Sequence, residues 1–228
     1  MTITTTKLTH AAGLAAVAGG LLYIGVQIKH PLLEAAFTTT TEYAVREAAK
    51  ILMAAFSLIG ITGIYLRQVR QTGVLGLIGY LLLSVGYLTI LNVQVIAVFV
   101  LPDLAGSQPD YVNDVLAVAT SGTPSGDVDR FQTLSQVAVT YIIGGVIFGI
   151  ALFRAAILPR WAAALLSIGA LATVATPQLP ELTQRLFALP VGIALIGLGY
   201  SLWREQRTPA RPAEPSPVSS PLDPAEAK

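Results

Sequence analysis

The sequence predicts an all-α fold: a polytopic membrane helical bundle with six transmembrane helices. Three observations lead to this class. Hydrophobic residues make up 54% of the 228 residues and charged residues only 12%, about half the charged share of an ordinary soluble domain. The mean hydropathy is +0.66, and the apolar residues fall into long stretches without a charge. Such a chain has too much apolar surface for one buried core, so part of it must face lipid.

The positions of the spans follow from the cost of placing an ionised side chain at the centre of a bilayer, about 2.5 to 3.5 kcal/mol on insertion scales. Uncharged stretches of roughly 20 residues therefore mark the membrane-crossing helices. We expect these helices at about residues 10–28, 46–66, 74–101, 131–153, 159–177 and 186–203. Together they form one transmembrane domain, 1–203, whose third helix is long enough to tilt or to protrude from the membrane.

Local signals mark two of the helix starts. Thr39 and Glu42 have the spacing of a capping box, in which the threonine hydroxyl accepts a backbone N–H of the first helical turn. The second helix is therefore expected to begin near Glu42, before its membrane-embedded part. Pro159 suits the first turn of the fifth helix, because proline lacks an N–H that would be unpaired at a helix start.

The distribution of lysine and arginine predicts the orientation. If the amino terminus is cytoplasmic, the basic residues near helix ends on that side are Lys7, Arg67, Arg70, Arg154, Arg160, Arg204, Arg207 and Arg211. The smaller set on the other side is Lys29, Arg46, Lys50, Arg130 and Arg185. Because cytoplasmic loops are enriched in Lys and Arg, we expect both termini to be inside, the N-in/C-in arrangement.

Two segments outside the spans have a distinct character. Within the long outer loop 103–130, Tyr111, Val115 and Ala119 recur at helical spacing, which predicts a short amphipathic helix between the third and fourth spans. This helix could cover an outward-facing pocket, or it could lie on the membrane surface and shield the bundle, which we favour. The tail 204–228 is rich in proline, serine and alanine, and we expect it to be a disordered cytoplasmic segment.

Three glycine-rich stretches resemble known sequences: Gly13 to Pro31, Gly60 to Gln68, and Gly197 to Arg204. They resemble a group of uncharacterised actinobacterial integral membrane proteins and, more loosely, a bacterial domain family of unknown function with six predicted helices. The likeness extends over nearly the whole chain except the tail. It implies a multi-pass protein of the bacterial cytoplasmic (inner) membrane, and it implies neither an activity nor functional residues.

Several kinds of chemistry lack the residues that they need. There is no cysteine, and the two histidines, His10 and His30, fall at opposite ends of the first predicted helix, so no haem or metal site is expected in the bundle. No Gly-x-Ser-x-Gly elbow and no phosphate-binding glycine loop occurs. The net charge of +1 comes with no basic stripe, which argues against nucleic acid. We therefore expect a protein that is not an enzyme and carries no cofactor.

The polar residues inside the spans gather in their predicted outer halves. The candidate ligand contacts of an outer cavity are Arg46, Glu47, Lys50, Asn92, Gln94, Gln136 and Thr140. In one interpretation Lys50 or Arg46 meets an anionic group, while the amides orient a small or lipid-like ligand. In the other, which we favour, the amides only bridge helices, and Lys50 extends to the membrane boundary and pairs with Glu47.

Two functions fit this pattern. The first is a non-catalytic membrane scaffold or accessory protein that binds a protein partner or membrane lipid. The alternative is a transporter or channel for a small solute or lipid, with an outward-facing polar cavity. Close pairs of small residues, such as Ala16 with Gly20 and Gly145 with Gly149, let helices approach closely. They could pack the chain's own bundle, which we favour, or a homodimer.

Overall fold

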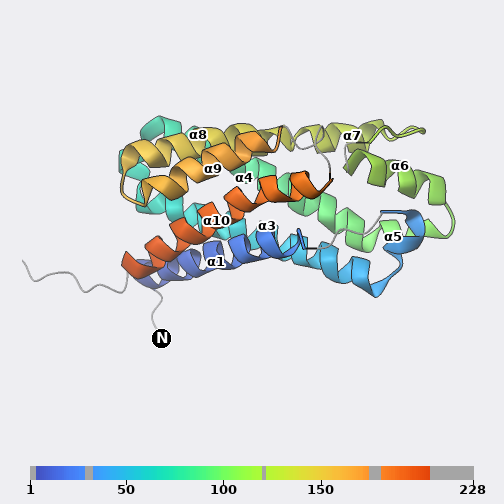
Figure 1. Ribbon diagram of the computed structural model, residues 1–228, viewed down its shortest axis with the longest axis horizontal. Coiled ribbons are helices and arrows are strands. Elements are labelled where there is room, and N and C mark those ends of the chain that lie inside the picture. Colours follow the sequence, from blue (N-terminus) through green and yellow to red (C-terminus); the bar gives the residue numbers. More distant parts are fainter. Residues whose placement is uncertain (1–3, 29–32, 120–121, 175–180, 206–228) are drawn as a thin grey trace, which may run out of the picture.

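The computed structural model describes residues 4–28, 33–119, 122–174 and 181–205, and every regular element in them is a helix (Figure 1). The helices are α1 (Thr5–Gly25), α2 (Ala35–Thr38), α3 (Thr41–Arg67), α4 (Val69–Phe99), α5 (Leu101–Ala105), α6 (Pro109–Ala119), α7 (Asp129–Gln136), α8 (Val139–Ala155), α9 (Arg160–Ala172) and α10 (Glu181–Glu205). The expected all-α fold is confirmed. The predicted tail lies outside the described residues from residue 206 onward.

Four helices in the described ranges are long and apolar enough to cross a membrane: α1, α3, α4, and the stretch Asp129–Ala155, which comprises α7 and α8. The apolar helix α9 has 13 residues, a length of about 20 Å at 1.5 Å per residue. That is short of a hydrocarbon core of about 30 Å. The chain is therefore a membrane protein by these four helices, while the count of six and the orientation stay predictions.

The start of α3 uses a different threonine from the one predicted. Thr40 is the N-cap, and its hydroxyl accepts the backbone N–H of Tyr43 at 3.2 Å. The hydroxyl of Thr39 instead donates to the carbonyl of Ala36 at 2.9 Å. The helix thus begins next to Glu42, as expected, but the predicted cap residue is wrong by one position.

A sharp reversal joins α3 to α4. Gln68 alone separates them, and the short segment 69–72 is followed by Gly73, whose φ of 57° and ψ of −151° are not helical. Glycine adopts a positive φ at little cost, whereas a side chain there would be strained. The continuous part of α4 therefore begins at residue 74.

The fourth predicted span, 131–153, is divided into two helices. Between α7 and α8, the N–H groups of Val137 and Ala138 bond to the carbonyls of Leu134 and Ser135, three residues back. Such tightened turns are typical of short 3₁₀ segments at helix ends. Neither glycine nor proline stands at this break, so the sequence does not predict it.

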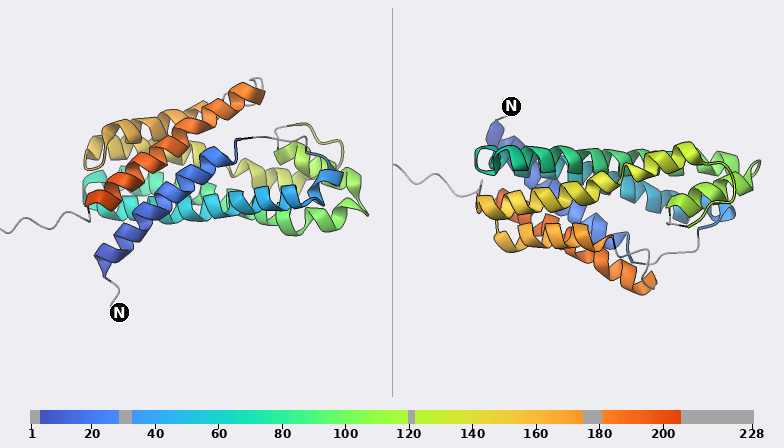
Figure 2. Two further views of the ribbon diagram at one scale, coloured as in Figure 1. Left: turned by 60° about the horizontal axis from the view of Figure 1, so that its bottom comes forward. Right: turned by 90° about the horizontal axis from the view of Figure 1, so that it is seen from above.

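Small residues bring the long helices together. α1 packs against α3 and α10, α4 against α8, and α9 against α8 and α10 (Figures 1 and 2). A Cβ added at Gly60 would come within 2.6 Å of Ala16 Cα, and one added at Gly20 within 2.5 Å of the carbonyl oxygen of Gly192. These residues therefore pack the chain's own bundle, as we favoured from the sequence.

The end of the molecule farthest from the carboxyl end of α10 is a packed unit that we call the cap. It consists of α2, α5, α6 and α7, with the first turns of α3 and the last turns of α4 (Figure 1). Its apolar core contains Ala35, Tyr43, Ala97, Leu101, Val112, Val115, Leu116 and Val128. The long helices enclose a separate, larger core, so the cap and the bundle are each packed by their own residues.

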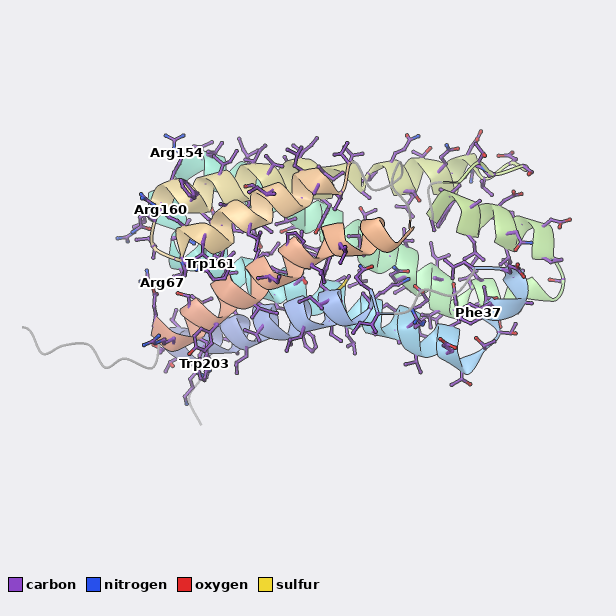
Figure 3. All side chains as sticks on the ribbon, viewed as in Figure 1. Phe37, Arg67, Arg154, Arg160, Trp161 and Trp203 are labelled. Atoms are coloured by element: carbon purple, nitrogen blue, oxygen red, sulfur yellow. The ribbon has the colours of Figure 1, made fainter. Side chains whose placement is uncertain are left out.

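Basic side chains gather at the end opposite the cap. Arg67, Arg154 and Arg160 all lie there, as does Trp203 (Figure 3). Arg67 Nε donates to Glu205 Oε2 at 2.9 Å and so links the end of α3 to the end of α10. Arginine and tryptophan are both enriched where membrane proteins meet the water boundary, which suits this end as a membrane face.

Candidate functional site

A cavity of about 380 Å³ lies where the cap meets the bundle. This volume falls within the range of about 300 to 1,000 Å³ that is typical of ligand pockets. Residues from α3 to α7 line it, and most of them are apolar. The polar lining residues are Tyr43, Glu47, Lys50, Thr89, Gln94 and Ser135.

An ion pair on α3 supplies the charges of the cavity wall. Glu47 and Lys50 lie three positions apart and so share a helix face, and the Lys50 ammonium donates to Glu47 Oε1 at 2.6 Å. The Glu47 side chain is 5% exposed and the Lys50 side chain 19%. Burying two charges is costly and requires that each compensates the other. The predicted pairing is confirmed, and the wall is neutral at this point.

Two hydroxyl groups of lining residues have no partner among the residues that the structure describes. Tyr43 Oη and Ser135 Oγ are buried and make no hydrogen bond within the described part of the chain. An unpaired buried polar group costs about 1–3 kcal/mol, and few are found in native structures. By contrast, the hydroxyl of Thr89 donates to the carbonyl of Val85 at 3.0 Å. Tyr43 and Ser135 therefore have unused hydrogen-bonding capacity at the cavity wall.

Helix α6 forms one wall of the cavity through Val115 and Leu116, which are 3% and 4% exposed. Polar contacts hold α6 in position. Asn113 Oδ1 accepts the backbone N–H of Ala35 at 2.8 Å, and the Asp114 carboxylate accepts two backbone N–H groups of the following loop at 2.6 and 3.0 Å. The apolar face of α6 is thus covered by protein, and its position on the membrane surface stays a prediction.

The structure brings three of the predicted contacts to the cavity: Glu47, Lys50 and Gln94. Asn92 does not join them, because it is exposed and its Nδ2 donates to the carbonyl of Leu88 within α4 at 2.9 Å. The Asn92 side chain therefore lies outside the cavity lining, to which Gln94 belongs.

The remaining predicted contacts also lie away from the cavity lining. Arg46 pairs with Glu42 along α3, with Nε 3.4 Å from Oε1. Gln136 is exposed at the end of α7, and the hydroxyl of Thr140 donates to the carbonyl of Val137 at 2.7 Å. Gln136 and Thr140 lie away from the lining because the break between α7 and α8 interrupts the helix that we predicted to be continuous.

Sequence reasoning missed Tyr43 and Ser135. Tyr43 precedes Glu47 by four residues and Lys50 by seven, a spacing that puts all three on one helix face and that could have revealed it. No comparable signal marks Ser135, whose place depends on where α7 ends and on the packing of α6 against it.

Comparisons with protein-family models, with curated proteins and with solved structures find no match to this chain. Among the residues that the structure describes, no group of three or more His, Cys, Asp or Glu side chains could hold a metal ion. The cavity between the cap and the bundle is therefore the candidate functional site.

Proposed function

We propose that this protein is a non-catalytic membrane protein of accessory type, which binds the polar part of a lipid or of another small amphiphile in the cavity beneath the cap. The observation that carries the proposal is the cavity wall, in which a partly buried ion pair and two hydroxyls without a partner among the described residues lie within an apolar lining. Ligand pockets combine such a lining with a few placed polar groups. Since no histidine is found among the described lining residues, Ser135 has no base of the usual kind, which favours binding over turnover.

The membrane arrangement is part of the proposal. Six helices cross a bacterial cytoplasmic membrane, with both termini inside and the cap outside. The four candidate spans supply four of the six. The proposal assigns the other two to the 25-residue α10 and to the apolar α9, whose 13 described residues are shorter than a full crossing. The gathering of Arg67, Arg154 and Arg160 at one end (Figure 3) supports the orientation, because positively charged helix ends face the cytoplasm.

A transporter for a small solute or lipid is the alternative. Transport needs a path from the cavity to the far end of the bundle. The bundle core contains large side chains with no exposed surface, among them Leu83, Tyr87 and Phe148, and glycines in backbone contact with neighbouring helices. This packing supports the binding role over transport.

Co-purification tests the proposed function. The full chain is purified in mild detergent, and enriched lipids or small molecules are identified by mass spectrometry. Ala97 lines the cavity and is 7% exposed, so Ala97→Phe fills the space. Ala48→Phe is the matched control, because Ala48 is exposed on α3 and outside the lining. We expect an enriched species on the wild type and the control and its loss from Ala97→Phe; equal amounts on all three proteins would contradict binding in the cavity.

A further inference from the structure

We propose that the ligand of the cavity is a zwitterion: a head group or small molecule with one ammonium group and one phosphate-like oxyanion, such as phosphoethanolamine. This inference rests on the proposed function, because it requires that the cavity binds a molecule at all. A zwitterion differs from the anionic ligand that an unpaired Lys50 or Arg46 would favour.

The charge of the wall is the first argument. Glu47 and Lys50 are the charged residues among the described lining residues, and at 2.6 Å they compensate each other. An anion beside the Lys50 ammonium also lies close to the Glu47 carboxylate and is repelled by it, and a simple cation meets the reverse situation. A zwitterion can place its oxyanion near Lys50 and its ammonium near Glu47. It thereby adds no net charge beside the Glu47 carboxylate, whose side chain is 5% exposed.

Hydrogen-bonding capacity is the second argument. The pair occupies one of the three N–H donors of Lys50 and one of the two carboxylate oxygens of Glu47. Donors then remain for an oxyanion, and an acceptor remains for an ammonium. The amide of Gln94 adds further donors. The hydroxyls of Tyr43 and Ser135 are buried at the wall without a partner among the described residues, and they add donors once they turn toward the ligand. A phosphate group, with several oxygens, can use more of them than a carboxylate can.

The size of the cavity limits the part of the ligand that it holds. At about 380 Å³ it lies near the lower end of the range for ligand pockets, which suits a head group or a small solute and not a whole two-chain lipid. Apolar side chains such as Ile90, Val93 and Ile96 suit the first carbon atoms behind a lipid head group. A free solute with the same two charged groups has the same recognition chemistry, so the experiment must separate the two sources.

Ligand-dependent melting of the full chain in detergent tests the inference. The probes are short-chain phosphatidylethanolamine (zwitterionic), phosphatidylglycerol (anionic), diacylglycerol (uncharged) and water-soluble glycerophosphoethanolamine. We expect the zwitterionic lipid to raise the melting temperature of the wild type at about a tenfold lower concentration than the anionic and uncharged lipids. A rise with glycerophosphoethanolamine as well supports a free solute as the ligand, whereas a rise with the zwitterionic lipid alone supports a lipid head group.

Three variants assign the preference to the ion pair. Glu47→Gln leaves the Lys50 charge alone and should shift the preference toward the anionic lipid. The double variant with Glu47→Gln and Lys50→Met leaves no unpaired charge, and it should lose the charge preference. It also keeps the test usable if the single variant fails to fold. The control combines Glu42→Gln with Arg46→Met, because this more exposed pair on α3 lies outside the lining; it should keep the preference.

The outcomes separate this inference from the proposed function. Equal shifts with the zwitterionic and anionic lipids, or an unchanged preference in the double variant, overturn the zwitterion while lipid binding stands. No shift with any probe also overturns the zwitterion. If, in addition, no species co-purifies with the wild type, the proposed function fails as well.

Discussion

Two ion pairs on α3 lie about one turn apart and differ in burial. In the first, the side chains of Glu42 and Arg46 are 45% and 20% exposed, whereas those of Glu47 and Lys50 are 5% and 19% exposed. An exposed pair contributes about 0–1 kcal/mol to stability. Removing one partner of a buried pair costs several kcal/mol, because the other charge is left without compensation in a site that excludes water. The two pairs therefore form a natural comparison within one helix.

We expect Lys50→Met to lower the free energy of unfolding by about 2–4 kcal/mol and Arg46→Met by less than about 1 kcal/mol. Adding Glu47→Gln to Lys50→Met should recover most of the loss, since no unpaired charge then remains. Chemical denaturation of the purified variants in detergent micelles measures these differences. Equal losses for the two single variants would show that the burial of the Glu47 side chain has no energetic consequence.

Removing the Tyr43 hydroxyl, in contrast to removing the Lys50 ammonium, should not destabilise the protein. Tyr43→Phe removes a buried hydroxyl that has no partner among the described residues, so the ligand-free protein should be as stable as the wild type or more stable by up to about 1 kcal/mol. Tyr80→Phe is the control, because the Tyr80 hydroxyl is 3.1 Å from Thr62 Oγ1 and its loss should cost about 1 kcal/mol.

The same two variants separate stability from binding. Tyr43→Phe should weaken the lipid-dependent rise in melting temperature, and Tyr80→Phe should not, because only Tyr43 lines the cavity. A Tyr43→Phe protein that is less stable than the wild type without ligand would indicate that this hydroxyl has a structural partner and is not free for a ligand.

Between helices, glycines set the packing distance. Gly60→Ala would place a Cβ 2.6 Å from the backbone of Ala16, so α1 and α3 must separate, and we expect a loss of about 1–3 kcal/mol. Gly25→Ala, at the end of α1, meets no atom within 4 Å, and alanine favours a helix more than glycine does, so its stability should be unchanged or rise by up to about 1 kcal/mol. Thermal melting compares the two, and a Gly60→Ala protein that melts like the wild type would contradict this packing.

The long apolar helices could be predicted because the cost of a charge in the bilayer acts on each stretch of sequence separately. The division of α7 from α8 could not, since it depends on backbone hydrogen bonds at Val137 and Ala138 that no glycine or proline announces. At the site, the spacing of Glu47 and Lys50 was sufficient to predict their pairing. The position of Ser135 was not predictable, because it depends on how separate helices pack in the cap.

The two ends of the molecule's long axis differ in structure and in charge. The cap has its own apolar core and lies at one end, next to the cavity, while Arg67, Arg154 and Arg160 mark the other end (Figure 3). A ligand in the cavity contacts both α3 and α4 of the bundle and α6 of the cap. Binding therefore joins two separately packed units, which is why a ligand should raise the melting temperature of the chain as a whole.

The orientation of this axis decides which compartment supplies the ligand. The native chain has no cysteine, so one introduced cysteine reports one position. Asp127, in the loop that leads into α7, and Arg154, at the basic end, are both exposed. If the cap faces outward, a membrane-impermeant thiol reagent should label Asp127→Cys on intact cells and should label Arg154→Cys only after the membrane is opened. The reverse pattern would place the cavity in the cytoplasmic half of the membrane, and the ligand would then have to come from the inner leaflet or the cytoplasm.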